Sequence, residues 1–141
     1  PVDYFHRKLG EIMISKCGIS RNRNNLQSAL EEVEILSENF KSNLKIPETN
    51  SGLNVELEKA LRLEDFIELS KLMIKDAFER EESCGAHFRE EYQTKEGEAE
   101  RNDELFSHIA VWKFNSENNS HTRFSEDLEF KKINLNNRNY K

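Results

Sequence analysis

The chain is poor in the residues that staple or interrupt small folds: 141 residues include two cysteines, two prolines, five glycines and one tryptophan. Cys17 and Cys84 lie far apart in sequence, so we expect no disulfide framework and a reduced, cytosolic environment. Neither the dinucleotide fingerprint nor the phosphate-binding loop fits the glycines, which stand at positions 10, 18, 52, 85 and 97.

Long apolar and long basic runs are also missing. No segment approaches the roughly 20 apolar residues of a membrane span, and no signal-peptide pattern is present, so we expect no direct membrane insertion. A net charge of −6 and a pI near 5.3 argue against nucleic acid or an anionic membrane as the main partner. The chain opens on Pro1 without an initiator methionine, and we expect it to be a processed product or a piece of a longer protein.

What the chain does contain is a foldable balance of 34% charged and 35% hydrophobic residues, enough for one domain with a modest core. Apolar residues recur at spacings of three and four, which predicts helices over about 2–17, 23–43 and 54–83. Gly18 is the predicted stop of the first helix.

The third predicted helix carries an apolar face that is unusually broad. Its main band is widened by a second set of leucines, and such a face usually needs more than one neighbour. We therefore expect part of it to be exposed or buried by self-association. The main band consists of Leu63, Phe66, Ile67, Met73, Ile74, Ala77 and Phe78, and the second set of Leu57, Leu61, Leu69 and Leu72.

Beyond Gly85 the pattern changes to alternation with β-branched and aromatic residues. Residues 108–114 and 128–135 are predicted strands joined by the polar segment 115–122, within a β appendage of about 106–135. The expected fold is mainly α: a three-helix bundle of antiparallel, spectrin-repeat-like helices followed by a small β-hairpin appendage.

The segment 80–92, "REESCGAHFREEY", raises the question of chemistry. Cys84 and His87, with Cys17 and His108, offer four potential metal ligands but none of the paired spacings typical of zinc sites. Cys84 and His87 also suggest a nucleophile and base, although a cysteine after a predicted helix lies at the end whose dipole disfavours a thiolate. A thiol or metal enzyme remains an alternative.

A structural interpretation of the same segment is a tight turn fixed by ion pairs. Gly85 follows the predicted helix end, where a left-handed residue commonly closes the last turn. Arg80, Glu82 and Arg89 are placed to pair around it. We call residues 80–92 the clasp.

The clasp resembles the Arg-x-Glu-Ser-Arg-Gly-Ala-His-x-Arg-x-Asp-Tyr signature of the flavoprotein subunit of succinate dehydrogenase and fumarate reductase, with a related signature in L-aspartate oxidase. Most of the signature is present in this chain: Arg80, Glu82, Ser83, Gly85, Ala86, His87, Arg89 and Tyr92.

The resemblance extends over essentially the whole chain, and is strongest to subunits of the Bacteroidetes type. Residues 5–22 look like the family's first C-terminal helix, and the downstream match consists of Asp103, Glu104, His108, Arg138 and Tyr140. Three departures stand out: Cys84 replaces the usual arginine, Glu91 an aspartate and Gln93 a proline.

The resemblance implies the C-terminal helical domain of a larger flavoprotein, covering residues 1–141. In that family an FAD held covalently on a histidine exchanges hydride with succinate or fumarate, and an arginine shuttles the proton. Electrons pass to an iron–sulfur subunit, then to quinone. The FAD-binding domain lies upstream. The implied location is cytoplasmic, where the complex holds the subunit peripherally on the cytoplasmic face of the inner membrane.

By this resemblance the present chain holds neither FAD nor substrate, no metal and no catalytic residue, and it is inactive alone although its parent is an enzyme. The clasp is then a structural or interdomain contact made by Arg80, Glu82, Ser83, Gly85, His87, Arg89 and Tyr92. The alternative to a domain of an oxidoreductase is a stand-alone helical protein-interaction module.

Overall fold

The computed structural model describes residues 1–49 and 52–136 and divides the chain into two compact units. Unit 1 is Pro1–Glu79 and unit 2 is Arg80–Lys141. Arg138 and Tyr140, which contribute to the family resemblance, lie outside the described residues.

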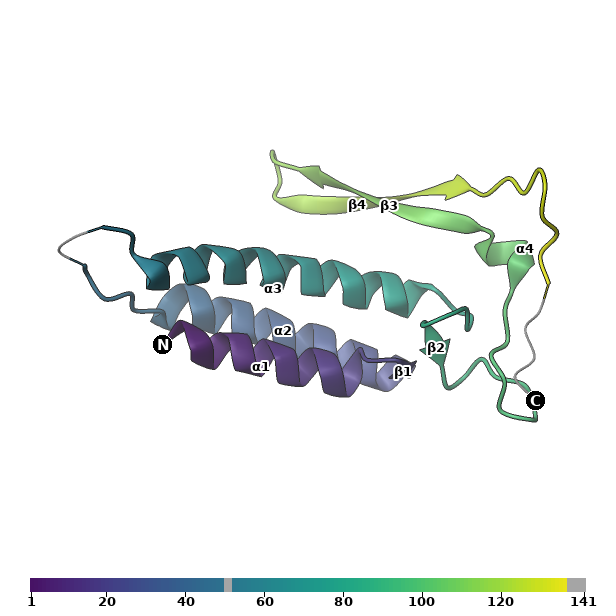
Figure 1. The fold of residues 1–141 in the computed structure, drawn as a ribbon, viewed down its shortest axis with the longest axis horizontal. Coiled ribbons are helices and arrows are strands. Elements are labelled where there is room, and N and C mark those ends of the chain that lie inside the picture. The colour runs from purple at the N-terminus through teal and green to yellow at the C-terminus, as the bar shows by residue number, and fades with distance from the viewer. Residues whose placement is uncertain (50–51, 137–141) are drawn as a thin grey trace. The chain divides into compact units, whose positions relative to one another are not determined.

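Unit 1 is a bundle of three helices that lie side by side and run alternately up and down (Figure 1). They are α1 (Val2–Lys16), α2 (Arg23–Asn43) and α3 (Val55–Glu79), with the two-residue strand β1 (Ser20–Arg21) between the first two. The first two helices agree with the predicted bounds within one residue, because the apolar spacing that predicts them also buries them.

The core of unit 1 runs along all three helices. Each helix contributes residues at alternating steps of three and four, the spacing that keeps one face turned inward. The rings of Phe5 and Phe40 meet edge to face at 5.5 Å between α1 and α2. The buried apolar side chains are Val2, Phe5, Leu9, Cys17, Leu26, Ala29, Val33, Leu36, Phe40, Ala60, Leu63, Ile67, Ile74 and Ala77.

Local side chains set the helix ends. The Asn22 side chain accepts a hydrogen bond from the backbone N–H of Asn25 at 2.8 Å at the start of α2, and Asn54 accepts likewise from Leu57 at 3.1 Å at the start of α3. These are N-caps. Beyond the end of α1, a Cβ on Gly18 would stand 2.7 Å from the Ile14 carbonyl oxygen, so only glycine fits there.

The broad apolar face predicted for α3 is only partly buried, as expected. Leu63, Ile67 and Ile74 enter the core, whereas Phe66 and Met73 of the same predicted band are 44% and 55% exposed. The second set is also largely exposed, since Leu57, Leu61 and Leu69 are each 44–58% accessible to solvent.

The end of α3 differs from the prediction. The helix stops at Glu79 rather than near residue 83. A longer helix needs the Cys84 N–H to donate to the Arg80 carbonyl, but that N–H donates to the His87 carbonyl at 2.8 Å instead. The Arg80 carbonyl is contacted by the His87 side chain at 2.9 Å. A competing hydrogen-bond pattern therefore ends the helix early.

Unit 2 opens with the clasp and the two-residue strand β2 (Phe88–Arg89), then has the short helix α4 (Asp103–Phe106), which was not predicted. Strands β3 (His108–Asn115) and β4 (Ser120–Asp127) follow as an antiparallel hairpin (Figure 1).

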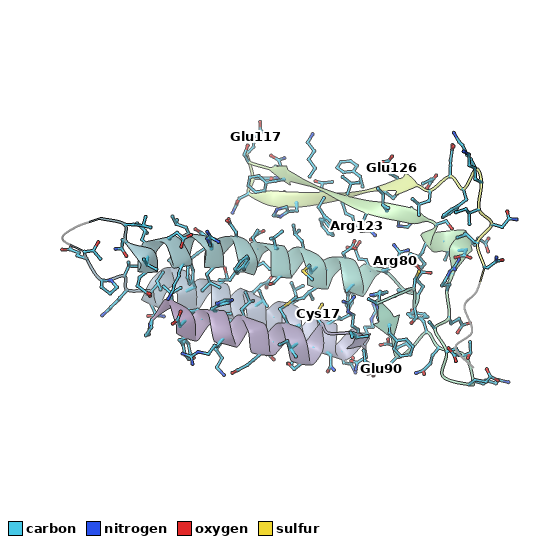
Figure 2. The ribbon with its side chains drawn as sticks, viewed as in Figure 1. Cys17, Arg80, Glu90, Glu117, Arg123 and Glu126 are labelled. Atoms are coloured by element: carbon cyan, nitrogen blue, oxygen red, sulfur yellow. The ribbon has the colours of Figure 1, made fainter. Side chains whose placement is uncertain are left out.

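The second strand of the hairpin was predicted wrongly. It lies at Ser120–Asp127, not at 128–135, which is neither helix nor strand. A short turn joins the two strands; it contains Glu117 (Figure 2) and Asn119, which has φ +50°. Asn115 pairs with Ser120 at the turn, and the pairing continues from there to His108 and Asp127. Turn length fixes hairpin pairing, so the polar segment next to the turn becomes the strand.

The expected fold class is confirmed: a mainly helical three-helix bundle followed by a small antiparallel β appendage. Within the part of the chain that the structure describes, no helix combines the length and hydropathy needed to cross a membrane.

Candidate functional site: the clasp

Arg80 is the hub of the clasp and follows the last turn of α3 directly (Figure 2). Its Nε lies 2.8 Å and its Nη2 2.6 Å from Glu82 Oε1. The guanidinium also donates to the Phe106 carbonyl at 2.8 Å and the His108 carbonyl at 3.3 Å, and it lies 5.8 Å from the centre of the Phe106 ring. One side chain thus ties the start of unit 2 to the residues that open β3.

Glu82 is the acidic partner, and its side chain is 2% exposed. Its second oxygen accepts from the backbone N–H of Asn102 at 2.9 Å. The Asn102 side chain in turn caps α4 by accepting from the Leu105 N–H at 3.2 Å. A buried carboxylate needs such a full set of donors, so Glu82 links Arg80 to the helix that precedes the hairpin.

Ser83 and Arg89 form the inner layer of the clasp and are 0% and 1% exposed. The Ser83 hydroxyl accepts from the Arg89 N–H at 2.8 Å and donates to the Arg89 carbonyl at 3.1 Å. The Arg89 Nε donates to Glu91 at 3.1 Å, and its guanidinium lies 5.5 Å from the centre of the Tyr92 ring. Arg89 is therefore held as a buried, paired charge.

Gly85 occupies a tight reverse turn rather than a helix cap. Cys84 and His87 exchange two backbone hydrogen bonds of 2.8 and 3.1 Å across it. Gly85 has φ +60° and Ala86 has a negative φ. This is the pattern of a type II′ turn with glycine in its first central position. The expected left-handed glycine is found, but for a different reason than the one predicted.

The His87 side chain contacts the backbone in this turn. Its Nε2 lies 2.9 Å from the Arg80 carbonyl oxygen, and because a carbonyl only accepts, Nε2 carries the hydrogen. An imidazole used in this way orients backbone and is not poised through Nε2 to take a proton from a nucleophile.

Tyr92 closes the clasp through its backbone, which donates to Arg89 and accepts from Glu100 at 2.8 and 3.2 Å. Burial, followed by the nearby Glu81 carboxylate, raises the pKa of the Tyr92 phenol. The neutral phenol is thus favoured in the folded chain, as suits a ring that covers a guanidinium.

The two cysteines differ in environment. Cys17 is buried and Cys84 exposed, and both are free thiols. Burial raises the pKa of the Cys17 thiol, as expected for a small core residue. Cys84 lies five positions beyond the end of α3, so the helix-end dipole argued from the sequence does not apply to it. No cluster of three potential metal ligands occurs among residues 1–49 and 52–136.

Three residues that contact the clasp were not singled out from the sequence: Glu100, Asn102 and Phe106. The Glu100 carbonyl accepts from the Ser83 N–H at 2.9 Å. The loop before it folds back through a bridge between Gln93 and Ala99. Asn102 could have been found from the sequence, because an asparagine followed by two acidic residues is a helix-start pattern. Residues that accept hydrogen bonds only through a backbone carbonyl leave no signal in the sequence.

Residues 6–140 match the family described as fumarate reductase flavoprotein C-term. One relative, from the fumarate reductase (CoM/CoB) of Methanothermobacter marburgensis, is 38% identical over 85 residues, which is 60% of this chain and 15% of that protein. The fumarate reductase flavoprotein subunit of Proteus vulgaris is 31% identical over 119 residues, 84% of this chain and 19% of that protein.

Solved structures give the same picture. The fold matches a variant of E. coli quinol fumarate reductase FrdA with a TM-score of 0.81 and 25% identity, over 95% of this chain and 22% of that one. A quinol-fumarate reductase with menaquinol molecules matches with a TM-score of 0.79 at the same identity and coverage. The chain thus spans less than a quarter of the length of each of these four proteins.

Proposed function

The chain belongs to the family of fumarate reductase flavoprotein C-terminal regions, and from this premise we propose that it is the C-terminal structural domain of a succinate dehydrogenase or fumarate reductase flavoprotein subunit. The observation that carries the proposal is the match of residues 6–140 to that family. The whole subunit interconverts succinate and fumarate through FAD, and the FAD and substrate sites belong to the part of such a subunit that this chain does not span.

Within that subunit the clasp has a structural role. Arg80, Glu82 and Asn102 connect the start of unit 2 to α4 and β3 by hydrogen bonds of 2.6–3.3 Å. Such a network fixes backbone geometry, which supports a positioning function over chemistry. The seven clasp residues named from the sequence keep this role in the proposal.

The proposed partners follow from the same premise. They are the FAD-binding domain of the same polypeptide and the iron–sulfur subunit of the complex, with no nucleic acid. The complex lies on the cytoplasmic face of the inner membrane, and this domain does not enter the bilayer. The support is the match to quinol-fumarate reductase structures.

A stand-alone interaction module is the second candidate, favoured by the exposed apolar side chains of α3. Leu61, Leu69 and Met73 are each 55–58% exposed, and apolar surface of this kind often marks a protein contact. Such a module binds its partner without any flavin.

The test uses the full-length polypeptide that carries this sequence at its C-terminal end, next to the 141-residue chain. We expect the full-length protein to be yellow and to interconvert succinate and fumarate, and titration calorimetry to detect no FAD binding by the 141-residue chain at micromolar concentration. A full-length protein that carries no flavin and turns over neither acid contradicts the proposal and leaves the interaction module.

A further inference from the structure

The outer face of α1 carries a glycine that nothing in the described residues requires. Gly10 lies in the interior of α1 with an ordinary helical φ, and a Cβ built on it meets nothing within 4 Å. Glycine weakens a helix interior relative to alanine. Gly10 therefore lowers the stability of the helix, and the packing of unit 1 gives no reason for it. Gly18 differs, because a Cβ added there would collide with the Ile14 carbonyl.

Around Gly10 the helix surface forms a shallow hollow lined by His6, Arg7, Gly10, Glu11, Ile14 and Ser15. Ile14 is 81% exposed, more than any other large hydrophobic side chain described as exposed. The neighbouring charges lie at the edge: Arg7 donates to the Asp3 carbonyl at 3.3 Å and Glu11 pairs with Lys8 at 2.6 Å. An apolar centre with a polar rim is the anatomy of an interface.

We propose that this α1 face, made by His6, Arg7, Gly10 and Ile14, is the surface on which the flavin-carrying part of the full-length subunit docks. The inference rests on the proposed function. The matched relatives and solved chains are far longer than this chain, whose matched residues cover 15–22% of them.

The position of α1 in the chain selects this occupant. The matching family describes a C-terminal region, so in such a protein the remaining polypeptide precedes residue 6, and α1 is the element joined most directly to it. The missing Cβ of Gly10 lets a neighbouring backbone come close, and Ile14 fills the contact beside it.

The test compares Gly10→Leu in the 141-residue chain and in the full-length flavoprotein, with Gln27→Leu on the exposed side of α2 as the matched control. In the 141-residue chain we expect Gly10→Leu to leave Tm unchanged or raise it by about 2–4 °C, since leucine is the better helix former and the space is open. In the full-length protein we expect it to lower the Tm of this region by several degrees. Gln27→Leu should change Tm by a similar amount in the 141-residue chain and in the full-length protein.

Hydrogen exchange supplies the second readout. The amides of α1 should be more protected in the full-length protein than in the 141-residue chain, and both Gly10→Leu and Ile14→Ser should abolish that difference. Equal effects of Gly10→Leu in both proteins, in a flavin-loaded and active full-length subunit, overturn the docking surface alone. A full-length protein without flavin overturns the proposed function instead. A 141-residue chain that is dimeric and is dissociated by Gly10→Leu assigns the face to a second copy and also overturns the proposal.

Discussion

The bundle of unit 1 and the clasp of unit 2 bury opposite kinds of side chain. The bundle's core is mainly apolar, with Leu26, Val33 and Ile74 at 0% exposure. The clasp buries Glu82 and Arg89 at 2% and 1%. Apolar burial is non-directional and tolerates exchange of similar residues, whereas buried charges depend on particular partners at particular distances. The bundle core should therefore tolerate substitution by similar residues, whereas the clasp should lose stability when a single partner is replaced.

Breaking the clasp's central ion pair should have the largest effect. Arg80→Met leaves the Glu82 carboxylate buried without its main partner, which we expect to destabilise unit 2 by about 3–5 kcal/mol. Chemical denaturation, together with hydrogen exchange of β3 and β4, measures this loss. The matched control is Arg62→Met, because Arg62 pairs with Glu58 on the surface of α3 with 70% of its side chain exposed; its effect should stay below about 1 kcal/mol. Similar losses in the two variants contradict the account.

Removing core volume from the bundle should come next. Ile74→Ala creates a cavity at a fully buried position and should cost about 2–5 kcal/mol, whereas Ile74→Val should cost only about 0.5–1.5 kcal/mol. Urea unfolding of both variants gives the ratio. A large loss of stability in Ile74→Val means that the bundle core tolerates similar residues no better than the clasp does.

The difference between the two regions also explains what the sequence could predict. Apolar spacing locates α1 and α2 within a residue because burial of that face forms the helices. The end of α3 was missed because its competing hydrogen bonds come from His87, which lies seven residues beyond the acceptor Arg80. Strand β4 was missed because pairing across a short turn, not composition, makes Ser120–Asp127 a strand.

The clasp itself was predicted in part. The ion pair of Arg80 and Glu82 and the positive φ of Gly85 were expected, since charge types and glycine are visible in a sequence. The contribution of Asn102 was not, because a backbone N–H that reaches a carboxylate 20 residues earlier leaves no trace in residue type.

A pair of glycines separates backbone conformation from packing. A Cβ meets nothing within 4 Å at either Gly85 or Gly10, but Gly85 has φ +60°. Gly85→Ala should destabilise the chain by about 1 kcal/mol or more, and Gly10→Ala should stabilise the 141-residue chain by up to about 1 kcal/mol. Thermal unfolding of the two variants is the measurement, and a shift of the same sign in both refutes the turn assignment.

A small acid-dependent effect is expected between α1 and α2. Lys16 donates hydrogen bonds to Glu32 and, at 2.7 Å, to the Ser28 hydroxyl, and the first of these lowers the pKa of the Glu32 carboxyl below its usual value of 4.5. Because the folded-state pKa is the lower one, the stabilisation is complete above that usual value and is lost as pH falls through the folded pKa.

Lys16→Met should remove this component. The stability difference between the wild-type chain and Lys16→Met, measured by urea unfolding, should be larger at about pH 6 than at about pH 3. A difference that is equal at both pH values shows that the pair contributes nothing through its charge.

The central claim is that the clasp positions backbone and performs no chemistry, and His87 tests it most directly. The measurement is turnover per bound flavin in the assembled full-length His87→Ala enzyme. We expect assembly or thermal stability to fall because the Arg80 carbonyl loses its 2.9 Å partner, while turnover per flavin stays at the wild-type value in the molecules that assemble. Turnover per flavin that collapses while assembly and flavin content stay normal contradicts the account and places His87 in the active site.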